Sequence, residues 1–363
     1  MTQGLPRDPG PVPLSGLLPD ELAALMQEMG QKPYRGKQLF EAIHRQGITS
    51  LEQVTTLSKS LREALMESSR PVRSLNESAN VLSQDGTRKL AYSTHDGKVI
   101  ETVLIPMESG SYTQCISSQV GCALKCRFCM TGQLGFQRNL TAAEIVDQHA
   151  LALQYTGERS VRNIVFMGMG EPLLNVDNVV KAIRILTNSL GRDMSGRRIT
   201  VSTAGVIPGI ERLAVEAPVM LAVSLNAPDQ AIRERIMPIS SRYPLDQLLA
   251  TLKKWPLRPR QRMTFEYVLL PGVNDSAKNA ADLVKLLSNH RAKVNLIAFN
   301  PHPGSEYTRP TREQVDRFAA ILGAKHMTVT VRQSRGQDID AACGQLAGAI
   351  MGDGELDESE EDE

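Results

Sequence analysis

The sequence predicts an α/β fold in which parallel strands and helices alternate to form a partial (β/α)6 barrel. Short apolar runs alternate with segments of helical periodicity from residue 113 to about residue 335. This alternation implies parallel strands joined by crossover helices. Six strand–helix units precede a final strand, which fits a partial or distorted barrel. Polar clusters follow several strands, at the ends where such barrels place catalytic residues.

The barrel elements are predicted from the period of their apolar residues. The strands are expected at Tyr112–Ser117, Asn163–Met167, Arg198–Ser202, Val219–Leu225, Met263–Leu269, Val294–Phe299 and Met327–Arg332. The helix-like segments between them include Thr141–Tyr155, Val176–Leu190, Leu245–Leu252, Ala277–Leu287 and Thr311–Leu322. We assign residues 111–350 to this barrel.

Two smaller units are predicted before the barrel. Residues 16–75 form a helical unit, with helices that begin at Pro19, Lys37 and Lys59. Residues 76–110 form a β-hairpin extension, because Asp-Gly pairs at Asp85 and Asp96 separate alternating apolar runs. The bases and the glycine of Tyr34-Arg-Gly-Lys suit either phosphate at a helix start or a solvated cap.

The chain ends differ in composition from its body. Residues 1–15 are rich in Pro and Gly, and residues 351–363 are dominated by acids, so disorder is expected at both ends. The net charge of the chain is +1, but the last twelve residues carry eight acids and no base. The body is therefore basic, which suits either a polyanionic partner such as RNA or an ordinary charged surface.

Three of the five cysteines form a C-x3-C-x2-C motif, Cys122-Ala-Leu-Lys-Cys126-Arg-Phe-Cys129. Thiolates select soft metals and iron–sulfur clusters. A cubane cluster has four irons, so three cysteines leave one iron open for chemistry. The alternative is a zinc site completed by a residue such as His149. Structural disulfides are not expected, because the cysteine count is odd and no secretory leader or membrane span is recognisable. A cytoplasmic location follows.

Short polar side chains follow the other predicted strands. Gly168-Met-Gly-Glu171-Pro172 combines glycines, which permit close approach of a ligand, with a carboxylate that can hold an ammonium group. Ser202-Thr-Ala-Gly205, Ser224-Leu-Asn226 and Asn300 supply further hydrogen-bonding groups. Each segment alone is typical of a polar loop, but together at successive strand ends they indicate the rim of a pocket.

The cysteine motif followed by a Gly-Glu-Pro strand end resembles the radical S-adenosylmethionine (SAM) superfamily. Ser117–Cys129, Gly168–Pro172 and Arg332–Leu346 resemble, more narrowly, the RNA adenine methyltransferases of the RlmN/Cfr family, and the likeness runs from about residue 18 to residue 350. The resemblance implies a 4Fe–4S cluster on Cys122, Cys126 and Cys129, whose open iron chelates SAM. It also implies SAM contacts from Gly170, Glu171, Ser202, Ser224, Leu225, Asn226 and Asn300.

The same resemblance gives roles to the remaining two cysteines. Cys343 matches the family cysteine that a first SAM methylates, and a radical from a second SAM then removes hydrogen from that methyl group. The resulting carbon adds to the adenine ring, Glu101 matches the acceptor of the ring proton, and Cys115 matches the thiol that releases the product through a disulfide with Cys343. For a lone cysteine, a small buried residue is the competing interpretation.

The resemblance implies methylation of C2 of adenine 2503 in 23S rRNA and of adenine 37 in tRNA, with flavodoxin as electron donor and a monomeric protein. The five cysteines are equally compatible with C8 methylation of the same rRNA adenine. Two readings from other classes stay open. One is an RNA-binding protein stabilised by a structural zinc ion, and the other is a radical SAM enzyme with a small-molecule substrate.

Overall fold

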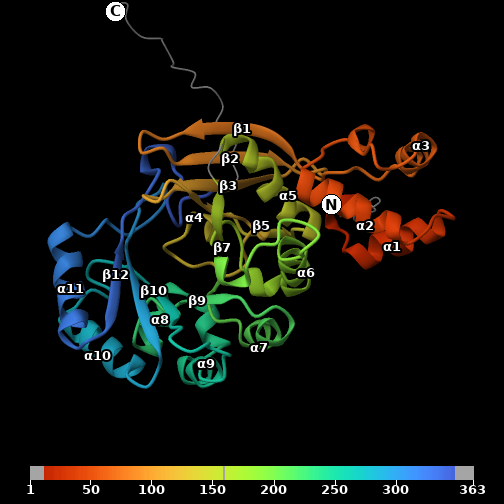
Figure 1. Cartoon of the computed structure of the whole chain (residues 1–363). Helices are drawn as coiled ribbons and strands as arrows, with labels where there is room; N and C mark the ends of the chain where they lie inside the picture. Colours follow the sequence, from red (N-terminus) through yellow and green to blue (C-terminus); the bar gives the residue numbers. More distant parts are fainter. Residues whose placement is uncertain (1–11, 158–159, 348–363) are drawn as a thin grey trace, which may run out of the picture.

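The computed structural model describes residues 12–157 and 160–347. Its main sheet has ten strands in the order β1-β2-β3-β4-β7-β8-β9-β10-β11-β12. The first four strands pair in antiparallel fashion, and every pair from β4 to β12 is parallel. The sheet curves, and helices cover its outer side (Figure 1). The α/β fold with a parallel sheet is confirmed.

The seven parallel strands and their helices alternate as the sequence predicts. The strands are β4 (Tyr112–Cys115), β7 (Val161–Phe166), β8 (Ile199–Thr203), β9 (Met220–Ser224), β10 (Met263–Leu269), β11 (Ala292–Ala298) and β12 (Thr328–Arg332). The helices that connect them are α5 (Ala142–Ala152), α6 (Val176–Leu186), α7 (Ile207–Glu216), α8 (Gln230–Ile236), α9 (Leu245–Leu252), α10 (Ala277–Leu287) and α11 (Arg312–Ala324).

An antiparallel extension widens the sheet on one side. It consists of β1 (Asn76–Leu82), β2 (Arg88–Ser93) and β3 (Val99–Pro106). Gly86 and Gly97 occupy its turns with φ of 81° and 74°, which is the left-handed region that an Asp-Gly turn requires. A separate two-stranded sheet consists of β5 (Gln119–Gly121) and β6 (Phe136–Asn139), and the short helix α4 (Met130–Gln133) lies between these strands in the chain.

The N-terminal helices pack against the barrel. They are α1 (Pro19–Glu28), α2 (Tyr34–Glu41) and α3 (Lys59–Glu67), drawn in red and orange in Figure 1. Their buried apolar residues belong to the same continuous core as those of α5 and the strands. Asp147 of α5 fixes this contact, because its buried carboxylate accepts hydrogen bonds from Ser15, Arg73 and Ser74.

The predicted disorder of residues 1–15 is wrong for its last residues. Leu14 and Ser15 are buried, and the Leu14 amide donates to the Pro71 carbonyl at 2.9 Å. The apolar Leu14 belongs to the core, and this burial orders the segment. The rest of that prediction, and the predicted disorder of residues 351–363, lie outside the described residues. No helix within the described ranges is long and apolar enough to cross a membrane.

Candidate active site and cofactor pocket

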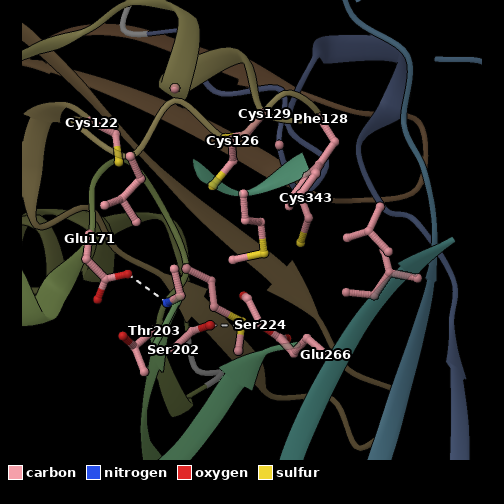
Figure 2. A pocket seen from close by; sticks show the side chains of 18 of the residues that line it. Cys122, Cys126, Phe128, Cys129, Glu171, Ser202, Thr203, Ser224, Glu266 and Cys343 are labelled. Atoms are coloured by element: carbon pink, nitrogen blue, oxygen red, sulfur yellow. Dashed lines mark hydrogen bonds between the residues drawn. The ribbon is translucent and has the colours of Figure 1, made fainter. Parts of the chain in front are cut away.

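A pocket opens at the carboxyl ends of the parallel strands and has an empty volume of about 950 Å³, its mouth included. Figure 2 shows the three motif cysteines and Cys343 on one side and Glu171, Ser202, Thr203 and Ser224 on the other. The carboxyl ends of the strands are where barrels of this kind place their active sites. The sequence therefore brings its cysteine motif and its polar strand ends together, as expected.

The cysteine loop is anchored by the β5–β6 hairpin. The Cys122 amide donates to the Gly135 carbonyl at 2.9 Å. Gly121 has a φ of 73°, and a Cβ atom there would lie 1.8 Å from the same carbonyl oxygen, so only glycine fits. Further along, the Arg127 amide donates to the Ile236 carbonyl at 3.0 Å, which ties the loop to α8.

The environment of the three thiols favours a bound metal centre that carries positive charge. Burial raises the pKa of Cys122, Cys126 and Cys129, and for Cys126 the negative charges of the other two thiolates raise it further. Three thiolates so close together need positive charge to neutralise them. Within the described ranges, no three His, Cys, Asp or Glu side chains converge closely enough for a single metal ion. Three thiolate ligands in one pocket suit a soft metal centre, either a zinc ion or an iron–sulfur cluster.

His149, the fourth ligand considered for zinc, does not line the pocket. Its side chain is buried in α5, where the Nδ1 atom lies 2.8 Å from Gln114 Oε1. Burial lowers the pKa of His149 to about 3, so the imidazole is a neutral core group.

The Gly-Glu-Pro segment follows β7 and packs against the cysteine loop. A Cβ atom on Gly170 would lie 2.5 Å from the Gln119 side chain, and Gly170 has a φ of 97°. The buried Glu171 accepts hydrogen bonds from the amides of Leu173 at 3.0 Å and Ala204 at 2.8 Å. Burial raises the pKa of Glu171, and these hydrogen bonds oppose the rise.

Most of the predicted SAM contacts line the pocket. Gly170, Glu171, Ser202, Ser224 and Asn300 all do. Leu225 and Asn226 do not line the pocket, and their backbone amides donate to the backbone carbonyl of Glu266.

Glu266 in β10 is a pocket residue that sequence reasoning missed. Its Oε2 atom accepts a hydrogen bond from Ser202 at 2.8 Å (Figure 2). Its buried Oε1 atom has no hydrogen-bond partner among the residues that the structure describes. Arg332 lies 3.9 Å from Oε1. An acidic residue within the otherwise apolar run Met263–Leu269 is the signal that could have identified it.

Cys343 lies at the pocket wall on a segment that is bonded to the cysteine loop. The Met130 amide donates to the Gly344 carbonyl at 2.7 Å, and Asn300 donates to the Cys343 carbonyl at 3.2 Å. Cys115 ends β4 and is buried outside the pocket lining. Burial raises the pKa of Cys115, and the charge of Cys343 raises it further. Burial also raises the pKa of Cys343, and the positive charge of Arg332 opposes the rise at both thiols. The thiols of Cys115 and Cys343 are therefore close enough for their charges to interact.

Glu101 does not line the pocket. It is 1% exposed, forms an ion pair with Lys89 at 3.2 Å, and accepts a hydrogen bond from the Ala347 amide at 2.8 Å. Glu101 thus holds the end of the segment that carries Cys343. Its role as a proton acceptor stays a prediction.

Comparison with known proteins agrees with this geometry. The radical SAM superfamily profile matches residues 116–284, and the profile described as the ribosomal RNA large subunit methyltransferase N-terminal domain matches residues 12–70. The chain is 49% identical to the dual-specificity RNA methyltransferase RlmN of Geobacter sulfurreducens over 93% of each protein. The chain belongs to the RlmN family. The RlmN of Syntrophobacter fumaroxidans is 48% identical over 90% of this chain and 95% of that protein.

A solved structure of the same family has the same fold. The crystal structure of a radical SAM methyltransferase from Sphaerobacter thermophilus matches with a TM-score of 0.89 and 43% identity, over 93% of this chain and all of that one. The chain is thus a radical SAM methyltransferase whose cofactors are a 4Fe–4S cluster and SAM. The zinc-stapled binding protein is thereby ruled out as an alternative.

Proposed function

We propose that the protein methylates C2 of an adenine in 23S rRNA and of the adenine beside the anticodon in tRNA. The RlmN relatives are named dual-specificity RNA methyltransferases, which supports RNA as the substrate. The observation that carries the chemical part of the proposal is the position of Cys343. Its thiol faces the pocket lined by Cys122, Cys126 and Cys129, and its segment is bonded to their loop.

When bound, the cluster and SAM supply a methyl group and a carbon radical that can remove a hydrogen atom. Cys122, Cys126 and Cys129 hold the cluster, and Glu171, Ser202, Ser224 and Asn300 contact SAM. The Cys343 thiol loses its proton and accepts the methyl group on Sγ. Arg332 assists this step, because its positive charge lowers the pKa of Cys343 against the rise that burial causes. The S-methyl group of Cys343 is then the source of the carbon that joins the adenine ring.

Cys115 completes the reaction in this proposal. After the ring proton is removed, the Cys115 thiolate attacks Cys343 Sγ, and a Cys115–Cys343 disulfide forms as the sulfur–carbon bond breaks. The electron pair of that bond passes to the carbon on the adenine ring, which takes up a proton to become the methyl group of the released base. Glu101 is the proposed proton acceptor. To reach the base, its carboxylate must exchange the hydrogen bond from Ala347 for a contact in the pocket.

The N-terminal helices and the basic body supply the proposed RNA-binding surface. The target adenine must leave its stack to reach a pocket at this depth. A cytosolic monomer that receives electrons from flavodoxin remains our expectation.

Reconstituted protein tests the proposal in vitro. Wild-type protein should convert adenine to 2-methyladenine in transcripts of both RNAs, as read by mass spectrometry of nucleosides. Cys343→Ala should give no product while keeping its iron, because the cluster ligands are untouched. Product from Cys343→Ala would refute the carrier role, and 8-methyladenine would identify the C8 activity instead.

A further inference from the structure

Arg233 of α8 is a buried cation that the proposed chemistry does not use. It is 0% exposed and is the largest fully buried side chain in the described ranges. Its guanidinium donates to the carbonyls of Leu225, Ser224 and Ala204 and to the Ser240 hydroxyl. All four acceptors are uncharged. Nowhere in the part of the chain that the structure describes does a carboxylate form an ion pair with Arg233.

An arginine in this position is costly without a counter-charge. Transferring an isolated charge from water into a protein interior is strongly unfavourable, even after the surroundings relax. Hydrogen bonds to carbonyls satisfy the guanidinium donors but do not neutralise the charge. Burial lowers the pKa of Arg233 to about 10, so it remains protonated at neutral pH. The chain therefore keeps a positive charge in its interior that needs an anion nearby.

The groups that can supply negative charge, the three motif cysteines, line the cofactor pocket on the other side of its wall. Ala204 and Ser224, whose carbonyls accept from Arg233, both line the cofactor pocket. The α8 helix is bonded to the cysteine loop through Ile236 and Arg127, and Ile236 packs in one apolar cluster with Cys122 and Cys126. Cys126 is the ionisable group whose charge acts on Arg233. A cluster held by three thiolates is anionic, and its reduced form carries one more negative charge than its oxidised form.

We propose that Arg233 is the fixed counter-charge of the iron–sulfur cluster and raises its reduction potential. Arg233 does not line the cofactor pocket, so it acts on the cluster through its charge and not by contact with substrate or SAM. It is therefore a positioning residue and not a catalytic one. Its positive charge stabilises the reduced cluster more than the oxidised one, because the reduced form is more negative. The charge thereby makes the electron needed for SAM cleavage easier to accept.

Three variants separate the charge of Arg233 from its hydrogen bonds. Arg233→Gln removes the charge and keeps an amide donor, whereas Arg233→Lys keeps the charge and loses the planar fork. Arg291→Gln is the control for loss of an arginine elsewhere: Arg291 also donates to two backbone carbonyls, those of Leu257 and Arg258, but it is exposed and its acceptors do not line the cofactor pocket. Each variant is reconstituted without SAM or RNA, and its iron content is measured before its potential.

The readout is the ratio of reduced to oxidised cluster in a redox titration followed by electron paramagnetic resonance. At a fixed potential, Arg233→Gln should lower this ratio at least tenfold, which corresponds to about 59 mV for a one-electron couple. Arg233→Lys and Arg291→Gln should stay within about threefold of wild type. A wild-type ratio in folded, iron-loaded Arg233→Gln overturns the proposal, as does an equal loss in Arg233→Lys.

Cluster loading supplies a second measurement if Arg233→Gln is poorly loaded. The proposal then expects Arg233→Lys to retain more iron than Arg233→Gln at equal helix content by circular dichroism. Equal iron loss in both variants would show that the hydrogen bonds matter and the charge does not, and would overturn the proposal. Neither measurement involves RNA, so its outcome is independent of the proposed substrate.

Discussion

Asp147 shows how one buried side chain joins two parts of the chain. Its carboxylate is buried in α5, pairs with Arg73 at 3.0 Å, and accepts from Ser15 and Ser74. Removal of one partner from a buried ion pair leaves the other charge uncompensated. Asp147→Ala should lower the free energy of unfolding by about 3–5 kcal/mol in urea titrations. The exposed pair Lys278–Asp282 is the comparison, where Asp282→Ala should cost about 0.5 kcal/mol. Equal losses would contradict the role of Asp147.

Cys115 gives the second prediction at the residue scale. If this thiol releases the product, Cys115→Ala should stop the reaction after the carbon–carbon bond has formed. Protein crosslinked to RNA should then accumulate and migrate slowly in denaturing gels. The double variant Cys115→Ala, Cys343→Ala is the control and should give no crosslink. Free product from Cys115→Ala at the wild-type rate would remove Cys115 from the mechanism.

The sequence predicted some pocket residues and not others. The cysteine motif and the Gly-Glu-Pro segment are local patterns, so their chemistry is readable from spacing. Glu266 lies within a strand and Arg233 within a helix behind the pocket wall, and the sequence around each residue does not identify the groups that it contacts. Their importance arises from burial, which depends on tertiary packing.

At the scale of elements, the β5–β6 hairpin sets the position of the cluster loop. Gly121 and Gly97 have nearly the same φ, 73° and 74°, so alanine strains the backbone similarly at both. The space around them differs, because a Cβ atom on Gly121 would meet the Gly135 carbonyl, whereas one on Gly97 would meet no described atom within 4 Å. Gly121→Ala should therefore lose at least half of the cluster iron, whereas Gly97→Ala keeps it. Iron assays on purified, reconstituted protein decide, and equal iron in both would contradict this role.

Elements were predicted correctly where the apolar period extends over many residues, and they were missed where tertiary contacts determine the local structure. The bounds of β10, α9 and α10 agree with their predicted ranges. The helices α7 and α8 were missed. In α7, Gly209 weakens helix propensity. It also allows close packing, because a Cβ atom at this position would lie only 2.6 Å from the Leu173 side chain. The strands β5 and β6 are three and four residues long, too short for a period-two signal.

At the scale of the whole molecule, two buried histidines should make stability fall in acid. Burial lowers the pKa of both His44 and His149 from 6.5 to about 3, with smaller contributions from Arg73 and Arg192. Between these values only the unfolded chain binds the proton, so stability decreases as the pH falls through this window. Each histidine should contribute about 1.4 kcal/mol per pH unit. Urea unfolding at about pH 7 and about pH 5 measures this slope.

His149→Gln isolates one of these contributions. The amide can keep a hydrogen bond to Gln114, but it does not titrate. The slope of the unfolding free energy against pH should be smaller in this variant by about 1.4 kcal/mol per pH unit. His326→Gln is the control at an exposed position and should keep the full slope. An unchanged slope in His149→Gln would mean that His149 is already protonated in the folded protein.

The central claim is that the whole molecule delivers a methyl carbon from Cys343 to C2 of adenine in RNA. The most direct test maps methyladenosines by mass spectrometry in 23S rRNA and tRNA from a strain that lacks the gene. 2-Methyladenosine should be absent there, should return when the wild-type gene is restored, and should stay absent with Cys343→Ala. Persistence of 2-methyladenosine in the deletion strain, or loss of 8-methyladenosine in its place, would contradict the claim.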